Sequence, residues 1–246
     1  RGCPYKCSFC NIASTHWQKV SRFSMERIKA EINYVAQHSK VKELQLADDN
    51  FGIFKQDVET AKALAEAQNK YDWPNYVQAG TAKNNKDRIR EMAKILQGRF
   101  NPGASIQSSD PQVLDNIHRV NLPINELAKI SRDFSTGYNS FTEIILALPG
   151  DTKEAHFKSN LDLIDVGFSI IRNHQFMLLE GTESHVRQSR EKFNMKSLFH
   201  VQPRCFGFYE AYGKKFYNAE IEEVCVSTDS MTYKEYQECR SFNLTV

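Results

Sequence analysis

The sequence has no long apolar run and no excess of charge of one sign. None of its 246 residues belongs to a stretch approaching the roughly 20 apolar residues that a membrane-spanning helix needs. Its 32 Lys and Arg against 30 Asp and Glu leave a formal net charge of +2, too balanced for a surface that binds nucleic acid. We therefore expect a cytoplasmic protein with neither a membrane nor a nucleic acid as its partner.

The chain also lacks an initiator methionine, and its richest motif lies within the first ten residues. In α/β proteins a ligand-binding loop follows a strand. We therefore expect a first strand, and a further domain, to precede residue 1.

A disulfide framework is not expected, because a chain of this size buries a sufficient core and its six cysteines fit a reducing compartment. Three of them form the pattern Cys-x3-Cys-x2-Cys at Cys3, Cys7 and Cys10. Three thiolates on one short loop can hold three irons of a four-iron cubane. The fourth iron then stays open, and an open position is what separates catalytic from structural metal sites.

Zinc is the main alternative for these cysteines. A structural zinc site usually takes two short Cys or His pairs separated by a longer stretch, and no second pair is present here. His16 is the nearest available fourth ligand, and the remaining cysteines lie far along the chain, at Cys205, Cys225 and Cys239. A zinc-binding structural module and ordinary thiols remain open as alternatives at this point.

Strand and helix patterns alternate along most of the chain. Short apolar strands are predicted at residues 44–47, 76–79, 104–107 and 143–148, with extended segments at 168–171 and 175–179. Asp110 followed by Pro111 predicts a capped helix start, and Thr232 predicts another. Alternation indicates a parallel sheet with crossover helices, whose carboxyl ends share one rim. It allows either a β/α barrel or an open doubly wound sheet.

The cysteine motif with an aromatic residue, Phe9, before its last cysteine resembles the signature of radical S-adenosylmethionine (SAM) enzymes. The resemblance implies a 4Fe–4S cluster on Cys3, Cys7 and Cys10, with SAM chelating the open iron through its methionine group. One electron from the cluster would cleave SAM to methionine and a 5′-deoxyadenosyl radical, which takes hydrogen from a small-molecule substrate. An electron donor such as flavodoxin or ferredoxin is implied as a partner.

The same resemblance implies a partial (β/α)6 TIM-like barrel with parallel strands and its first strand missing. We expect this radical SAM core to span residues 1–201, and a small C-terminal extension, rich in tyrosine, to span 202–246.

Several residues match cofactor-binding positions of the family. Phe9 is expected to face the adenine, with simple loop packing as the alternative. Asp49, in the sequence Asp-Asp-Asn, stands where members bind the methionine amino group, although many members have Gly-Gly-Glu there; a helix cap is the alternative. Leu179 matches the ending of the sixth strand, where backbone groups read the adenine edge.

The segment from Gln107 and Ser108 to Arg119 resembles the fourth strand of the methylthiotransferase and cobalamin-binding branches. There the Gln and Ser approach the ribose or the methionine, and the Arg pairs with a carboxylate. A structural ion pair is the alternative for Arg119. Lys83 is a second candidate for a carboxylate, and His174 is a candidate acid or base for the substrate. No catalytic residue is assigned.

The branch that fits best is cobalamin-linked, with methyl transfer or rearrangement as its reaction. Cobalamin would then be bound by the missing upstream domain, since no motif in residues 1–246 binds it. A methylthiotransferase acting on RNA or protein is the second enzyme hypothesis, and the zinc module is the hypothesis outside enzymes.

Overall fold

The fold is built on one parallel sheet. The computed structural model describes residues 2–13, 17–83, 85–126, 129 and 141–246. Its strands are β1 (Glu43–Gln45), β2 (Tyr76–Gly80), β3 (Phe100–Gln107), β4 (Phe141–Leu146) and β5 (Ile170–Gln175), which pair in sequence order and in parallel. This confirms the α/β prediction. Strands β1 and β5 form the two edges of this sheet.

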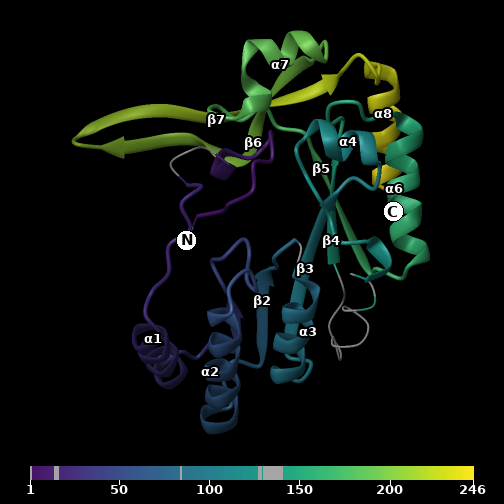
Figure 1. Ribbon diagram of the computed structural model, residues 1–246. Coiled ribbons are helices and arrows are strands. Elements are labelled where there is room, and N and C mark those ends of the chain that lie inside the picture. Colours follow the sequence, from purple (N-terminus) through teal and green to yellow (C-terminus); the bar gives the residue numbers. More distant parts are fainter. Residues whose placement is uncertain (1, 14–16, 84, 127–128, 130–140) are drawn as a thin grey trace.

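Helices pack against the outer face of the sheet. Helices α1 (Met25–His38), α2 (Gln56–Tyr71) and α3 (Lys86–Ile95) follow one another beside β1 to β3 (Figure 1). Their core includes Leu64, Val77 and Met92, none of which is more than 1% exposed. Helix α6 (Lys153–Asp165) covers β4, where Ile144 packs on Leu163. Burying such side chains is the main source of the fold's stability.

Helix α4 (Pro111–Asn116) begins as the sequence predicts. The carboxylate of Asp110 accepts hydrogen bonds from the backbone N–H groups of Gln112 and Val113, at 2.8 and 3.0 Å, and Pro111 occupies the first turn. The cap fixes the chain direction directly after β3, so the residues between β3 and α4 are held at the rim of the sheet.

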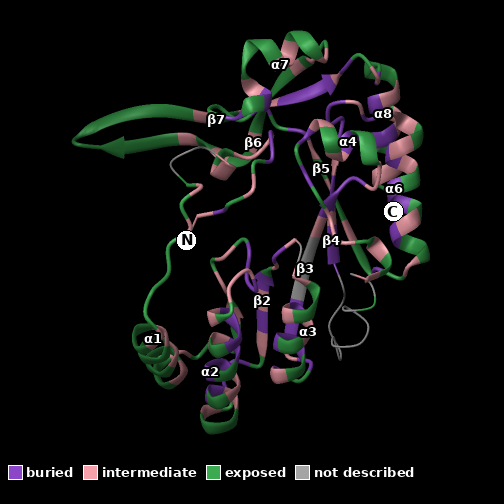
Figure 2. Cartoon of the chain, in the orientation of Figure 1, coloured by how far each residue is buried: buried purple, intermediate pink, exposed green. Residues whose placement is uncertain are grey.

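The C-terminal part is a long hairpin followed by a helix. After η2 (Glu183–His185) and α7 (Arg187–Lys192), strands β6 (Lys196–Ala211) and β7 (Lys214–Ser227) pair antiparallel and project as an exposed arm (Figures 1 and 2). Helix α8 (Tyr233–Asn243) starts with the predicted Thr232 cap and lies along α6. The expected domain boundary at residue 202 falls within β6, and the division itself remains a prediction.

The extended segments expected at residues 168–171 and 175–179 are only partly strand. Strand β5 runs through Arg172, Asn173 and His174 and ends at Gln175, so residues 176–179 lie beyond it. The side chains of β5 alternate between the two faces of the sheet. Asn173 points toward α6, where its side chain donates to Asn160 at 3.0 Å, while Arg172 lines a cavity on the inner face.

The same alternation holds across the sheet. Outward-facing Val77, Ile106 and Ile144 are at most 1% exposed and pack under helices. Inward positions carry Gln78, Ser105 and other polar side chains, which line a cavity. Among the described helices, none is both long and apolar enough to cross a membrane.

Candidate active site

A cavity of about 400 Å³ lies between the cysteine loop and the inner face of the sheet. The loop lines it from one side, and the carboxyl ends of the strands and the segment after α4 line it from the other. It brings together seven of the residues predicted for cofactor or metal binding: Cys3, Cys7, Phe9, Cys10, Asp49, Gln107 and Arg119. Lys83, the second candidate for a carboxylate, lines the same cavity.

Backbone contacts hold the cysteine loop in place. The N–H of Cys3 donates to the carbonyl of Trp17 at 2.9 Å, and the N–H of Ser8 donates to that of Ile117 at 3.1 Å. Gly2 has a φ of +31°, and a Cβ on it would lie 2.4 Å from the Trp17 oxygen. Only glycine fits such a close approach, so the residue before Cys3 is dictated by the turn of the loop.

The donor set of this loop fits a cubane cluster. Cys3 and Cys7 are buried and Cys10 is partly buried, and all three line the same cavity. In the described part of the chain, no three His, Cys, Asp or Glu side chains converge as ligands of a single ion must. Thiolates around a cubane each bind a different iron and are therefore spread more widely. His16 lies outside the described residues.

Two cations flank the thiols. The Nζ of Lys83 lies 3.2 Å from the Sγ of Cys7. Burial lowers the pKa of Arg119, and the neighbouring sulfurs of Cys7, Cys10 and Cys3 partly offset this effect. Burial raises the pKa of the Cys10 thiol. Positive groups beside buried sulfurs favour the thiolate, the form that binds iron.

Arg119 is fixed by the backbone of β3. Its Nε donates to the side-chain oxygen of Asn121 at 2.7 Å, and its Nη2 donates to the carbonyl of Ser105. Asn121 in turn donates to the carbonyl of Ile106 at 2.7 Å. These partners are neutral, so they position the guanidinium without forming a structural ion pair, and its positive charge lies against the cysteine loop. A carboxylate of the ligand remains its predicted partner.

The three residues of the Asp-Asp-Asn segment, Asp48 to Asn50, have different environments. The Oδ1 of Asp48 accepts the N–H of Asn50 at 3.0 Å, so the turn-forming role falls to Asp48. Asp49 lines the cavity, and its role toward the methionine amino group remains a prediction. Asn50 also lines it, is 2% exposed, and neither its Oδ1 nor its Nδ2 finds a hydrogen-bond partner among the described residues.

The sequence analysis missed Asn50, because an Asn after two Asp residues is typical of an ordinary turn. An unpaired buried amide costs about 1–3 kcal/mol. Gln107 has the same property at its Oε1 and is 7% exposed, with a φ of +66°. Two residues that line the cavity of the cysteines, Asn50 after β1 and Gln107 at the end of β3, thus carry unsatisfied buried amide atoms, which a polar ligand bound there could satisfy.

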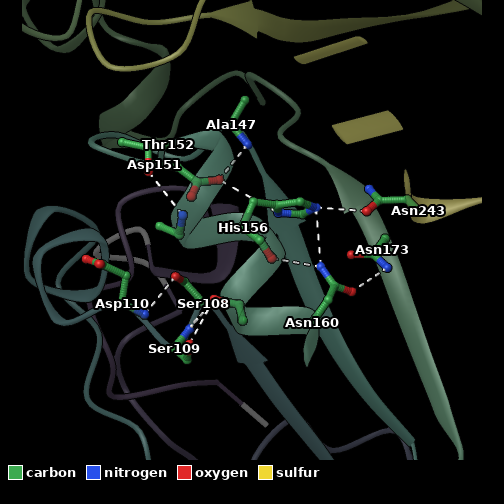
Figure 3. A network of polar contacts seen from close by, with 12 residues as sticks. Ser108, Ser109, Asp110, Ala147, Asp151, Thr152, His156, Asn160, Asn173 and Asn243 are labelled. Atoms are coloured by element: carbon green, nitrogen blue, oxygen red, sulfur yellow. Dashed lines mark hydrogen bonds and ion pairs between the residues drawn. The ribbon is translucent and has the colours of Figure 1, made fainter. Parts of the chain in front are cut away.

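Two predicted residues lie outside this cavity. The hydroxyl of Ser108 accepts the N–H of Asp110 at 3.1 Å, next to the α4 cap (Figure 3). Leu179 lines a second cavity of about 380 Å³ together with Ile145 and Met177, and Phe9 lies between the two cavities. The cofactor roles of Ser108 and Leu179 remain predictions.

A separate buried polar network lies behind β4 (Figure 3). The Oδ2 of Asp151 accepts the N–H of Ala147 at 3.1 Å and lies 3.9 Å from the Nδ1 of His156. The His156 Nε2 is 2.9 Å from the Oδ1 of Asn243 in α8. Burial raises the pKa of Asp151 to about 7 and lowers the pKa of His156. These side chains join α6 to α8 and lie apart from the cysteine cavity.

Comparisons with known proteins agree with this geometry. Residues 1–159 match the Radical SAM superfamily. The chain is 30% identical over 250 positions to the cobalamin-dependent radical SAM methyltransferase TokK of Streptomyces tokunonensis, and it is equally similar to the 2-(S-pantetheinyl)-carbapenam-3-carboxylate methyltransferase of Streptantibioticus cattleyicolor. Each alignment covers 98% of this chain, which spans 35% of the length of either relative.

Among solved structures, the fold resembles the radical SAM methyltransferase TsrM of Kitasatospora setae, determined with cobalamin and a 4Fe–4S cluster bound. The TM-score is 0.62 at 14% identity, over 86% of this chain and 38% of that one. The chain therefore belongs to the radical SAM superfamily of enzymes, whose cofactors are a 4Fe–4S cluster and SAM.

Proposed function

We propose that residues 1–246 form the catalytic core of a cobalamin-dependent radical SAM methyltransferase that acts on a small molecule. The two relatives at 30% identity are methyltransferases, and one of them is named as cobalamin-dependent. Cobalamin itself would be held by residues outside this chain, because no cobalamin motif lies within it.

In this proposal Cys3, Cys7 and Cys10 hold the cluster, and Lys83 and Arg119 balance the charge of the thiolates. A 4Fe–4S cluster held by Cys3, Cys7 and Cys10 would supply the electron for reductive cleavage of SAM, and thereby the radical chemistry of the site. The rigid loop and the buried rim position SAM and exclude water from the radical.

The chain's own side chains would bind SAM in parts. Asn50 and Gln107 line the cavity, and the unpaired atoms are the Oδ1 and Nδ2 of Asn50 and the Oε1 of Gln107; a donor and acceptors of this kind suit the carboxylate and ammonium of the methionine group. Asp49 adds a carboxylate for the ammonium. Phe9 leads into the second, more apolar cavity, where Leu179 and Ile145 would pack on the adenine.

One observation carries the proposal: three thiols on one fixed loop share a cavity with two unsatisfied buried amides. A zinc module has no use for such amides, and membership of an enzyme superfamily argues against it. The methylthiotransferase hypothesis is disfavoured by the methyltransferase relatives.

The test is anaerobic reconstitution with iron and sulfide, followed by dithionite and SAM. We expect a brown protein that forms 5′-deoxyadenosine, and we expect the single alanine variants of Cys3, Cys7 and Cys10 to form none. Cys205→Ala, on the hairpin arm, is the matched control and should behave as the unaltered protein. A colourless protein with one bound zinc would refute the radical chemistry.

The proposed transfer of a methyl group to a small molecule is tested with SAM labelled in its methyl group. Label in a small-molecule acceptor is the expected result. Label in methylthio groups of RNA or protein would instead establish the methylthiotransferase.

A further inference from the structure

A charged cluster lies inside the partial barrel, on the inner faces of β4 and β5. The Oε1 of Glu143 lies 3.9 Å from the Nη1 of Arg172 and 3.7 Å from the Nε2 of His174. Glu143 and Arg172 both line the cysteine cavity. The side chains of Arg172 and His174 are 50% and 54% exposed, so neither belongs to the core; His174 lines the second cavity, next to the first.

Folding does not require charges at these positions. Barrel interiors are usually filled by branched apolar side chains, and the outward neighbour Ile144 is 1% exposed under α6. Ion pairs as long and open as this one contribute little to stability. A cluster that the fold does not need, and that faces the cavity of the cysteine loop, has the properties of a binding site.

The local contacts orient the cluster. The hydroxyl of Ser105 donates to the Oε2 of Glu143 at 2.5 Å, which leaves Oε1 toward Arg172 and His174. The guanidinium of Arg172 stacks on the ring of Phe141, 4.6 Å from its centroid. Both charged groups are therefore held in position before a ligand arrives, and preorganisation of this kind reduces the cost of binding.

The spacing of the two charges selects the ligand. A ligand with only a carboxylate would be attracted by Arg172 but repelled by the negative charge of Glu143. A ligand with only an amine would be attracted by Glu143 but repelled by the positive charge of Arg172. A molecule whose ammonium and carboxylate sit on one carbon can satisfy both partners at once, replacing one loose ion pair by two charge-assisted hydrogen bonds. A molecule with its two charges several carbons apart cannot reach both from one place.

We infer that Glu143 and Arg172 form a subsite for the α-amino acid group of the methyl acceptor, with the ammonium on Glu143 and the carboxylate on Arg172. This inference rests on the proposed function, since it names the substrate class of that same site. The subsite adjoins the cysteine loop, because the carbonyl of Ser105 accepts from Arg119, whose charge lies against Cys7. The bound substrate would thus lie beside SAM.

The inference is tested by calorimetric titration of the reconstituted protein, saturated with SAM, using four six-carbon probes. L-Norleucine carries both charges on one carbon, and 6-aminohexanoate is its isomer with the charges far apart. Hexanoate and hexylamine carry one charge each. We expect norleucine to bind at least about tenfold more tightly than the other three probes.

Variants locate the site. Glu143→Gln and Arg172→Gln should each weaken norleucine binding about tenfold or more. Arg187→Gln, which breaks an exposed pair on α7, is the control and should bind norleucine as the unaltered protein does. Equal binding of norleucine and 6-aminohexanoate would overturn the inference, and that comparison depends on no variant. Displacement of SAM by norleucine would also overturn it, because the subsite would then belong to the cofactor.

Formation of 5′-deoxyadenosine without substrate separates this inference from the proposed function. If the unaltered protein cleaves SAM but does not prefer norleucine, only the subsite is wrong. If it fails to cleave SAM at all, the proposed function itself is wrong, and the inference that rests on it falls as well.

Discussion

Replacing Asp151 by asparagine should remove a large part of the pH dependence of folding stability. Asp151 is 2% exposed, and its Oδ1 has no hydrogen-bond partner among the described residues. Burial raises its pKa from 3.8 to about 7, while the N–H groups of Ala147 and Thr152 lower it by less. The folded protein therefore holds a proton on Asp151 at pH values where the unfolded chain has already released it.

This difference in bound protons decides whether the folding stability rises or falls with pH. Below pH ~4 both states are protonated, and the stability of the fold at this site is fully present. As the pH rises to about 7, that stability is lost, because the folded state must either keep a costly proton or bury a charge. Between pH 5 and pH 8 the loss is on the order of 2–3 kcal/mol, because it accumulates from pH 5 to about pH 7 at roughly 1.4 kcal/mol for each pH unit.

Asparagine is neutral throughout and keeps an oxygen for the N–H of Ala147. The assay is urea unfolding of the cluster-free protein, followed by circular dichroism at pH 5 and pH 8. Asp151→Asn should gain about 2–3 kcal/mol relative to the unaltered protein on going from pH 5 to pH 8. The lowered pKa of His156 acts in both proteins and largely cancels in the comparison.

Asp165→Asn, at the exposed end of α6, is the control and should show no such gain. If Asp151→Asn instead follows the unaltered protein at both pH values, or loses stability at pH 8, Asp151 is ionised in the fold. The network of Figure 3 would then contain a buried ion pair with His156.

Two further predictions concern the cavity and the C-terminal helix. Asn50→Leu should weaken SAM binding about tenfold or more. Its free energy of unfolding in urea should stay unchanged or rise by about 1 kcal/mol, because the substitution removes two unpaired buried atoms. A loss of stability with normal SAM binding would show that Asn50 has a structural role instead. Thr232→Ala, which removes the hydroxyl half of a capping box with Glu235, should lower the unfolding free energy by about 1 kcal/mol without affecting 5′-deoxyadenosine formation.

Local signals predicted the framework of this chain well. The Asp110 and Thr232 caps and the strand–helix alternation depend on neighbours in sequence, and the structure has them where the residues indicate. The inner-face residues Glu143 and Arg172 escaped prediction. The sequence predicts an apolar strand at residues 143–148, and it predicts apolar extended segments on either side of the polar run at residues 172–174, without a role for Glu143 or Arg172.

The physical reason is that strands of a parallel sheet are usually covered on both faces and are therefore apolar throughout. Here helices cover the outer face and the inner face borders a cavity, so polar residues such as Glu143 and Arg172 occupy inner positions of β4 and β5. Whether a residue on the inner face is polar depends on what occupies the barrel. The tendency of individual residues to form strands does not contain that information. The same holds for Asn50, whose unsatisfied amide is visible only once the turn is folded.

The outer face of the sheet thus packs against helices, while the inner face borders the cavity. The two faces should therefore differ in how well they tolerate substitution. Val77, Ile106 and Ile144 are closely packed under helices, so changes there cost folding energy whatever the substrate. Glu143 contacts the Ser105 hydroxyl and His174, and Arg172 packs on the Phe141 ring; both side chains lie at the cavity, so changes there should alter the ligand at little cost to the fold. If these two charges form the inferred subsite, a chain that keeps the cysteine loop and the outer face can acquire a new substrate through changes on its inner face alone.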